Sequence, residues 1–339
     1  TMRKKHFLFA SVLALLCGSS TLHAQDFKLT SSGYFKNQGV DVMAFDDIYP
    51  EGHQGGVCII MNGHRVATNG DIRLEATPGQ WQPVPKQLDR KLGDNSITAT
   101  LCYPDSSRHL TGFNPMIYPD LHLIYTVNVE SKGKNIEVTV DLDRPIPQEF
   151  IGKVGFNLEF FPGSLFGKPW IMDGQSGIFP QQPNSPLMTT QPNYLHTGNY
   201  HDGKKSLADM DKLIGKGYSP IVADDIISEP YAKGTKCTSR PDDPYNKVTI
   251  ESLSGDLQLF DGRMNHNNGW FVLRSNIKPG VTKGAVKWII TPNVVADWMY
   301  QPVIQTSQIG YHPTQDKEAV IEMDIRDNRK ETAQIIRID

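Results

Sequence analysis

Apolar and polar residues alternate along much of the chain, which is the pattern of β-strands with one buried face. The clearest case is a pair of alternating runs at 121–130 and 136–143, joined by a short connection that contains Gly133. The residues on the apolar face are Leu121, Leu123, Tyr125, Val127, Val129, Ile136, Val138, Val140 and Leu142. This spacing predicts an antiparallel β-hairpin with one face in the core and one in water.

Similar alternation predicts further strands over 97–103, 154–160, 248–250, 257–259, 270–273 and 286–290. Frequent prolines from 162 to 192 indicate an irregular stretch, and Ser206 to Gly215 could form one short helix. The regular alternation of strand and helix that builds a parallel sheet is missing. We therefore expect an all-β fold, a large antiparallel β-sandwich that spans residues 27–295.

Composition and charge exclude several classes of protein. The chain has 339 residues, of which 38% are hydrophobic and 21% charged, so it can bury a sizeable core and is not a disordered or collagen-like protein. Its 34 basic and 37 acidic residues give a net charge of −3. Such a balance lacks the basic footprint of a nucleic-acid-binding protein, so no nucleic-acid partner is expected.

The N-terminus has the order of a secretory signal peptide. Three basic residues at 3–5 precede the apolar run 7–16, and Ala24 stands where the leader would be cut. We expect residues 1–24 to be removed and the protein to be exported to the periplasm or beyond the cell. A buried N-terminal helix and a lipid anchor at Cys17 are the alternatives. The run is too short to span a bilayer, and we expect no membrane span.

Cysteine spacing and sequence motifs give no sign of a metal or a cofactor. After cleavage of the leader, Cys58, Cys102 and Cys237 would remain, enough for at most one disulfide. A zinc-binding CxxC pair, nucleotide-binding glycine motifs and the GxSxG motif of serine hydrolases are all absent. The sequence thus predicts no metal, no cofactor and no catalytic residue.

Two tryptophans in loop-like contexts are candidates for carbohydrate binding, because a flat indole can stack on a sugar ring. Trp81 lies in the segment PGQWQP, and Trp170 lies in GKPWIMDG together with Lys168 and Asp173. The surrounding stretch 163–180 is rich in glycine, proline and aromatic residues, and long ordered loops are often functional. The alternative is that both tryptophans cover the core.

The segment Gln305 to Asp324 resembles the start of a known module. It reads QTSQIGYHPTQDKEAVIEMD, with Gln308-Ile309-Gly310-Tyr311-His312-Pro313 followed by a predicted strand from Lys317 to Met323. This pattern is similar to the opening of the immunoglobulin-like module that precedes the catalytic domain in family 9 glycoside hydrolases, the cellulase class. An immunoglobulin sandwich needs about 100 residues, so we expect 302–339 to be its incomplete first part.

Four upstream runs extend the resemblance to the N-terminal region of family 9-type enzymes of Bacteroidetes. These runs are 45–52, 77–83, 157–167 and 173–180. The resemblance implies a secreted enzyme acting on β-glucan or cellulose-type polysaccharide, with a poly- or oligosaccharide and a downstream catalytic domain of the same protein as partners. It implies a signal peptide at 1–24, the large sandwich at 25–301 and the start of the immunoglobulin-like module at 302–339. The large sandwich resembles galactose-mutarotase-like supersandwiches at the level of fold, which fixes no function.

Three hypotheses for the function follow. The first is an accessory, non-catalytic region that binds glycan or braces the catalytic domain. The second is a carbohydrate-active enzyme of mutarotase or lyase type, for which His64, His109 and Glu159 are the first candidates. The third is a structural spacer. A sheet face lined by His, Glu and Arg would favour the enzyme, exposed Trp or Tyr would favour binding, and a flat polar face would favour the spacer.

Overall fold

The computed structural model describes residues 26–47, 55–75, 78, 85–103, 121–182, 187–190, 226–264, 269–329, 332, 334 and 336. These residues form strands and short 3-10 turns, so the predicted all-β class is confirmed. The predicted helix at 206–215 lies outside them. No helix among the described residues is long and apolar enough to span a bilayer.

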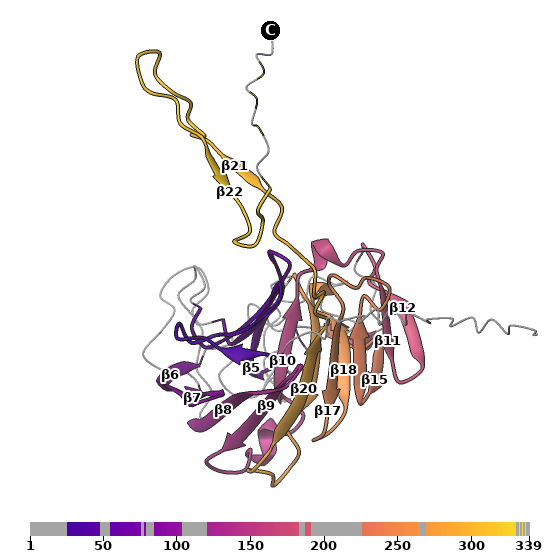
Figure 1. The fold of residues 1–339 in the computed structure, drawn as a ribbon. Helices are drawn as coiled ribbons and strands as arrows, with labels where there is room; N and C mark the ends of the chain where they lie inside the picture. The colour runs from indigo at the N-terminus through magenta and orange to yellow at the C-terminus, as the bar shows by residue number, and fades with distance from the viewer. Residues whose placement is uncertain are drawn as a thin grey trace, which may run out of the picture.

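Two nine-stranded antiparallel sheets, which we call sheet A and sheet C, make the sandwich (Figure 1). Sheet A has the spatial order β1 (Lys28–Leu29), β2 (Phe35–Asn37), β3 (Val40–Ala44), β4 (Val57–Met61), β5 (His64–Leu74), β10 (Val154–Phe160), β19 (Phe271–Asn276), β18 (Leu257–Asp261) and β15 (Ala232–Gly234). Sheet C has the order β12 (Gln175–Ile178), β11 (Pro169–Met172), β16 (Lys236–Ser239), β17 (Val248–Ser252), β20 (Val286–Pro292), β9 (Asn135–Leu142), β8 (Leu123–Lys132), β7 (Ser96–Tyr103) and β6 (Lys86–Leu92).

Smaller elements complete the described chain. They are the pairs β13 (Leu187–Thr190) with β14 (Ile226–Ser228) and β21 (Val303–Gln305) with β22 (Val320–Glu322), and the 3-10 turns η1 (Gln148–Phe150), η2 (Pro162–Ser164) and η5 (Gly262–Met264). The chain crosses between the two sheets several times, for example from β5 to β6 and from β9 to β10. Such crossings close one shared core.

The hairpin expected from the strongest alternation is confirmed as β8 and β9. Its strands pair from Tyr125 opposite Leu142 to Lys132 opposite Asn135, and Gly133 adopts a φ of 64° in the turn. Every second residue of β9 is buried, which is what a sheet with one face in the core requires. Trp288 of β20 lies in the shared core, since this side chain is 1% exposed and meets Phe156 edge-on.

One segment differs from the expectation. The stretch 163–180, expected to be an irregular loop, contains the hairpin of β11 and β12. Trp170 and Met172 are buried while Ile171 between them is exposed, which is strand alternation. Asp173 and Gly174 both have positive φ, 44° and 84°, the geometry of a tight two-residue hairpin turn. An Asp-Gly pair after alternating residues is a hairpin signal, and the surrounding glycines and prolines obscured it.

The chain leaves the sandwich after β20 and forms a separate hairpin. In Figure 1 the β21–β22 hairpin extends away from the two sheets and meets them only at its base. Its residues are far more exposed than those of the sandwich, with Ile321 at 44% and Val320 at 63%. The base, made of residues 296–300 and 324–329, is therefore where the hairpin and the sandwich meet.

Candidate functional site at the base of the C-terminal hairpin

One wall of the site is a row of side chains across the edge of sheet A. Lys28 of β1 is paired with Lys36 of β2, Lys36 with Asp41 of β3, and Asp41 with Ile60 of β4. Residues that lie directly opposite each other on paired strands point to the same face. The flanking residues Phe35 and Val42 are fully buried. The row therefore faces away from the core, toward the base of the hairpin.

Two aromatic residues of the linker after β20 form the opposite wall. A β-carbon on Gly39 would lie 2.7 Å from Cε3 of Trp298, so this indole rests directly on the turn between β2 and β3. A β-carbon on Gly63 would lie 3.6 Å from Cε2 of Tyr300, so the phenol covers the turn between β4 and β5. The two rings meet edge-on, with centroids 6.4 Å apart.

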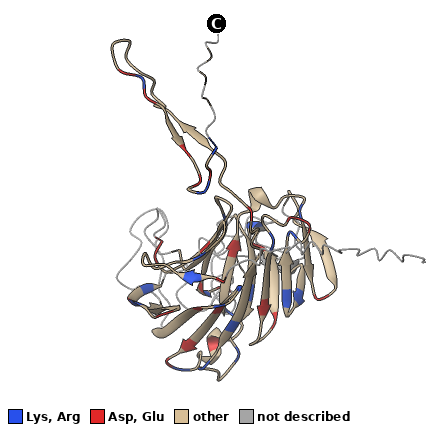
Figure 2. Cartoon of the chain, in the orientation of Figure 1, with Lys and Arg blue, Asp and Glu red and all other residues tan. Residues whose placement is uncertain are grey.

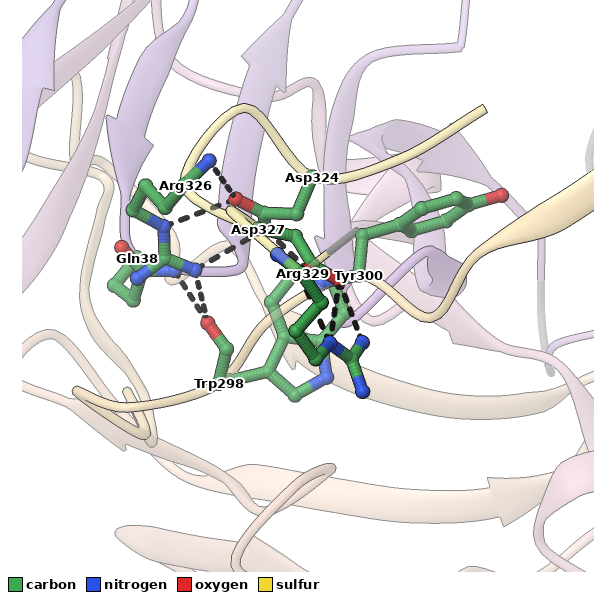
Figure 3. Close-up of polar contacts among 7 residues, drawn as sticks. All are labelled: Gln38, Trp298, Tyr300, Asp324, Arg326, Asp327 and Arg329. Carbon is green, nitrogen blue, oxygen red and sulfur yellow. Dashed lines mark hydrogen bonds and ion pairs between the residues drawn. The ribbon is translucent and has the colours of Figure 1, made fainter. Parts of the chain in front are cut away.

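Polar contacts hold the linker in this position. The side-chain amide of Gln38 donates a hydrogen bond of 2.6 Å to the carbonyl oxygen of Trp298, which also accepts one from the guanidinium of Arg326 (Figure 3). The backbone N–H of Tyr300 donates to Asp324 at 3.0 Å. The sandwich, the linker and the loop after β22 thus converge on a few atoms, although Gln38 and Trp298 are 260 residues apart in sequence.

Charges of both signs alternate at this base (Figure 2). Hydrogen bonds from Arg326 and from the backbone N–H of Tyr300 hold the pKa of Asp324 well below its usual range. Arg329 in the same way lowers the pKa of Asp327 to about 2. Both carboxylates are therefore ionised at neutral pH, and the loop after β22 is fastened by local ion pairs.

The two walls enclose a cleft with a volume of about 690 Å³, within the size range of small-molecule sites, which is roughly 300–1,000 Å³. Its lining combines the row of sheet A with Trp298, Tyr300 and Arg326. One carboxylate oxygen of Asp41, Oδ1, is buried and accepts no hydrogen bond. Burial raises the pKa of Asp41, and the positive charge of Lys36 partly opposes this rise.

A second polar cluster lies in the middle of sheet A, but it is closed. Arg274 of β19 is 1% exposed and pairs with Glu75, which is also 1% exposed, at 3.1 Å. The same guanidinium donates to Asn157, to Asn276 and to the carbonyl oxygens of Glu75 and Lys153. Five hydrogen bonds satisfy all five donors of the guanidinium.

The cluster continues along β10 and β5. Asn69, with a φ of 54°, donates to Glu159 at 2.6 Å, and the hydroxyl of Tyr125 donates to Asp71 at 2.9 Å. Burial raises the pKa of Glu75 to about 7, against the opposing effects of Arg274 and of a hydrogen bond from Asn157. Perturbed pKa values gather at functional sites, yet Glu75 and Glu159 are only 1% and 2% exposed. A substrate has no access to these carboxylates in this structure.

The residues singled out from the sequence lie elsewhere. Trp170 is 6% exposed, and its ring lies against Gly177 of β12, where a β-carbon would be 2.5 Å from Cζ2. Its indole N–H is buried without a hydrogen-bond partner. The side chain therefore packs in the core, and its role in carbohydrate binding stays a prediction. Trp81 and His109 lie outside the described residues.

Asp173 and Lys168 flank Trp170 on the surface. The carboxylate of Asp173 accepts hydrogen bonds from the backbone N–H groups of Thr235 and Lys236, and these bonds lower its pKa. Asp173 thus fastens the β11–β12 turn to the neighbouring segment. Lys168 is exposed, and its backbone pairs with Leu165 and Phe179. The structure does not bring either residue to the cleft described above.

The structure also locates the cysteines and the catalytic candidates His64 and Glu159 that the sequence suggested. Cys58 and Cys237 are free thiols, and both are buried. Within the part of the chain that the structure describes, no three His, Cys, Asp or Glu side chains converge in a way that could hold a metal ion. His64 is exposed at the start of β5, whereas Glu159 is buried in β10.

Comparison with known proteins gives only distant likenesses. No family model matches the chain, and no curated protein matches it either. Heparan sulfate lyase HepC from Pedobacter heparinus is similar at 12% identity and a TM-score of 0.29, with 89% of this chain and 41% of that chain covered. A galactose mutarotase-like protein from Lactobacillus casei is similar at 12% identity and a TM-score of 0.34, with 74% and 89% covered.

A third solved structure, the Slr1438 protein from Synechocystis sp. PCC 6803, has 8% identity and a TM-score of 0.32, with 79% of this chain and 96% of that chain covered. The chain spans about two fifths of the length of the HepC lyase that it matches. TM-scores in this range assign neither a fold family nor a function. The functional case therefore rests on the residues and the geometry of this chain.

Proposed function

We propose that this protein is the accessory, non-catalytic β-sandwich of a secreted polysaccharide hydrolase, and that it braces the start of an immunoglobulin-like module. The single observation that carries the proposal is the base of the hairpin. Gln38, Gly39 and Gly63 of the sandwich receive Trp298 and Tyr300 of the linker. A linker that only connects two independent modules would not need to pack its aromatic side chains closely against the turns of one of them.

A sequence motif in the hairpin supports the proposed class of parent enzyme, a polysaccharide hydrolase. The Gln308 to Pro313 motif, which resembles the opening of the family 9 immunoglobulin-like module, lies in the connection between β21 and β22. The hairpin presents exposed apolar residues, among them Ile304 at 62% and Met323 at 38%. Exposed apolar residues on one small hairpin are what the first strands of a larger sandwich would carry. In this proposal the downstream catalytic domain belongs to the same protein.

The proposal is tested by assaying the purified chain for catalysis. We expect no release of reducing ends from cellulose or mixed-linkage β-glucan beyond that of a boiled control, because this proposal places the carboxylate pair that a glycosidase needs in the downstream catalytic domain. Hydrolysis at a rate that scales with protein concentration would overturn the non-catalytic role.

The residues of the closed cluster of sheet A are the reason for a second candidate, a self-standing carbohydrate-active enzyme of mutarotase or lyase type, which would require the cluster to open to a substrate. Glu75 with a pKa of about 7, next to Arg274 and Glu159, has the composition of an acid–base site. The same assay extended to anomer interconversion and to formation of unsaturated uronic acids tests this candidate. Activity that is lost in Glu159→Gln while the fold is retained would establish it in place of the accessory role.

A further inference from the structure

The cleft at the base of the hairpin has the chemistry of a ligand site, beyond its part in bracing. Lys28 and Lys36 are direct cross-strand neighbours, and like charges in this position are destabilising. Neither ammonium hydrogen-bonds to a described residue. This repulsion between two like charges lies on the wall of a cleft. Unfavourable contacts of this kind are expected at functional positions rather than at structural ones.

Asp41 adds an acceptor to the same wall. Its Oδ1 is buried and has no hydrogen-bond partner, an arrangement that costs free energy until a donor arrives. Lys36 supplies donors on the neighbouring strand β2, and Lys28 supplies donors on β1, the strand beyond it. Donors and an acceptor side by side match a ligand whose groups can both donate and accept, which is the property of a hydroxyl.

Trp298 and Tyr300 supply the apolar part of the site. Both side chains are half-buried, and both rings line the cleft opposite the polar row. The charges of the lining nearly cancel, since Lys28, Lys36 and Arg326 stand against Asp26, Asp41 and Asp324. An excess of one sign, which would select a strongly charged ligand, is missing.

We propose that this cleft binds a short neutral oligosaccharide, with its hydroxyls on Lys28, Lys36 and Asp41 and an apolar sugar face on Trp298 or Tyr300. A volume of about 690 Å³ suffices for two or three sugar rings. The choice of a sugar among polyhydroxy ligands rests on the proposed function. The position, between the sandwich and the base of the hairpin, would let the ligand fasten the two parts together.

The experiment measures binding of purified full chain to neutral cello-, xylo-, manno- and laminari-oligosaccharides of two to six units, by isothermal titration calorimetry. Oligogalacturonate and heparan sulfate oligosaccharides form an anionic arm. We expect at least one neutral series to bind, with affinity that changes little between low and physiological salt. The loss of affinity in Asp41→Asn and in Lys28→Ala should be about tenfold or more, because the first removes the negative charge of an acceptor and the second removes a charged donor.

Asp89→Asn and Lys86→Ala on the exposed strand β6 are the matched controls, since they make the same chemical changes at residues that do not line the cleft. They should bind like the unaltered chain. Thermal denaturation confirms that each variant is folded. The hydrogen bonds described at the base of the hairpin do not involve Lys28, so Lys28→Ala leaves them in place. Binding of only the anionic arm, binding that survives both cleft substitutions, or no binding at millimolar concentration would each overturn the site. None of these outcomes would restore a catalytic role, which the activity assay tests separately.

Discussion

Sheet A contains two polar regions, the closed central cluster and the open cleft at the sheet edge. They are built from the same kinds of residue but differ in burial and in hydrogen bonding. In the central cluster, Arg274 and Glu75 are each 1% exposed, and every donor of the guanidinium is used. In the cleft at the sheet edge, Lys28 and Lys36 stand side by side, and an oxygen of Asp41 lacks a donor. Around Arg274 the buried network is closed and every donor of the guanidinium is used, although Oδ1 of Asn69 in the same cluster is buried without a partner. Such a network holds strands together, whereas the lysines of the cleft are exposed and can be reached by a ligand. Access to the charged groups, rather than the amount of charge, separates the structural region from the candidate site.

The largest expected effect is on the closed cluster. Arg274→Met should lower the free energy of unfolding by about 3–5 kcal/mol, because it leaves the buried Glu75 without its cation. Urea denaturation measures the loss. Lys91→Ala, which removes an exposed partner of Asp89, is the control and should change stability by less than about 0.5 kcal/mol. Equal effects of the two substitutions would remove the distinction between a closed cluster and a surface pair.

The pH dependence of stability sharpens the same contrast. The pKa of Glu75 is raised from 4.5 to about 7 in the folded protein, so the folded state holds the proton more tightly than the unfolded chain does. Stability from this group is therefore fully present below pH 4.5 and is lost as the pH rises toward 7. The total is on the order of 3 kcal/mol. Urea midpoints from pH 5 to pH 8 should fall less in Glu75→Gln than in the unaltered chain. An identical slope would show that Glu75 is ionised throughout.

A smaller effect on the free energy of unfolding is expected at Gly39, the turn residue on which the indole of Trp298 rests. Gly39 has a φ of 64°, and a β-carbon there would meet the indole at 2.7 Å. Gly39→Ala should cost about 1–2 kcal/mol from the backbone alone and should also dislodge the linker. Gly167→Ala is the matched control, because Gly167 has a φ of 72° with nothing within 4 Å of its β-position. Tryptophan fluorescence should shift in Gly39→Ala and stay unchanged in Gly167→Ala.

The smallest effect on stability belongs to the open cleft. Lys28→Ala should change the free energy of unfolding by less than about 0.5 kcal/mol or should stabilise the protein, because it relieves the repulsion with Lys36. Thermal denaturation at low ionic strength checks this. A loss of 2 kcal/mol or more in the free energy of unfolding, roughly the value of a buried polar contact, would show that Lys28 stabilises the fold as Arg274 does.

Local patterns in the sequence account for much of the sandwich. The alternation from Leu121 to Leu142 predicted β8 and β9, because a half-buried strand must alternate. The hairpin of β11 and β12 was missed, although Asp173-Gly174 was its signal. The central cluster was also missed except for Glu159, since charged residues within an apolar run do not reveal which partners will bury them.

The cleft could not be predicted, for a different reason. Its walls come from the first strands of the chain and from residues after the last strand of the sandwich, and only the fold brings them together. The closely spaced Trp298 and Tyr300 after the last predicted strand were a weak signal. The glycines at 39 and 63 that receive these rings look like ordinary turn residues in the sequence.

Hydrogen exchange at the base of the hairpin shows whether the sandwich holds this base in place. The backbone N–H of Tyr300 donates to Asp324, and that of Trp298 donates to the carbonyl oxygen of Val295. We predict slower exchange at these amides than at the exposed hairpin tip, residues 306–316, and faster exchange at the base alone in Gln38→Ala. Exchange of Trp298 and Tyr300 at the rate of the tip, unchanged by Gln38→Ala, would contradict the account.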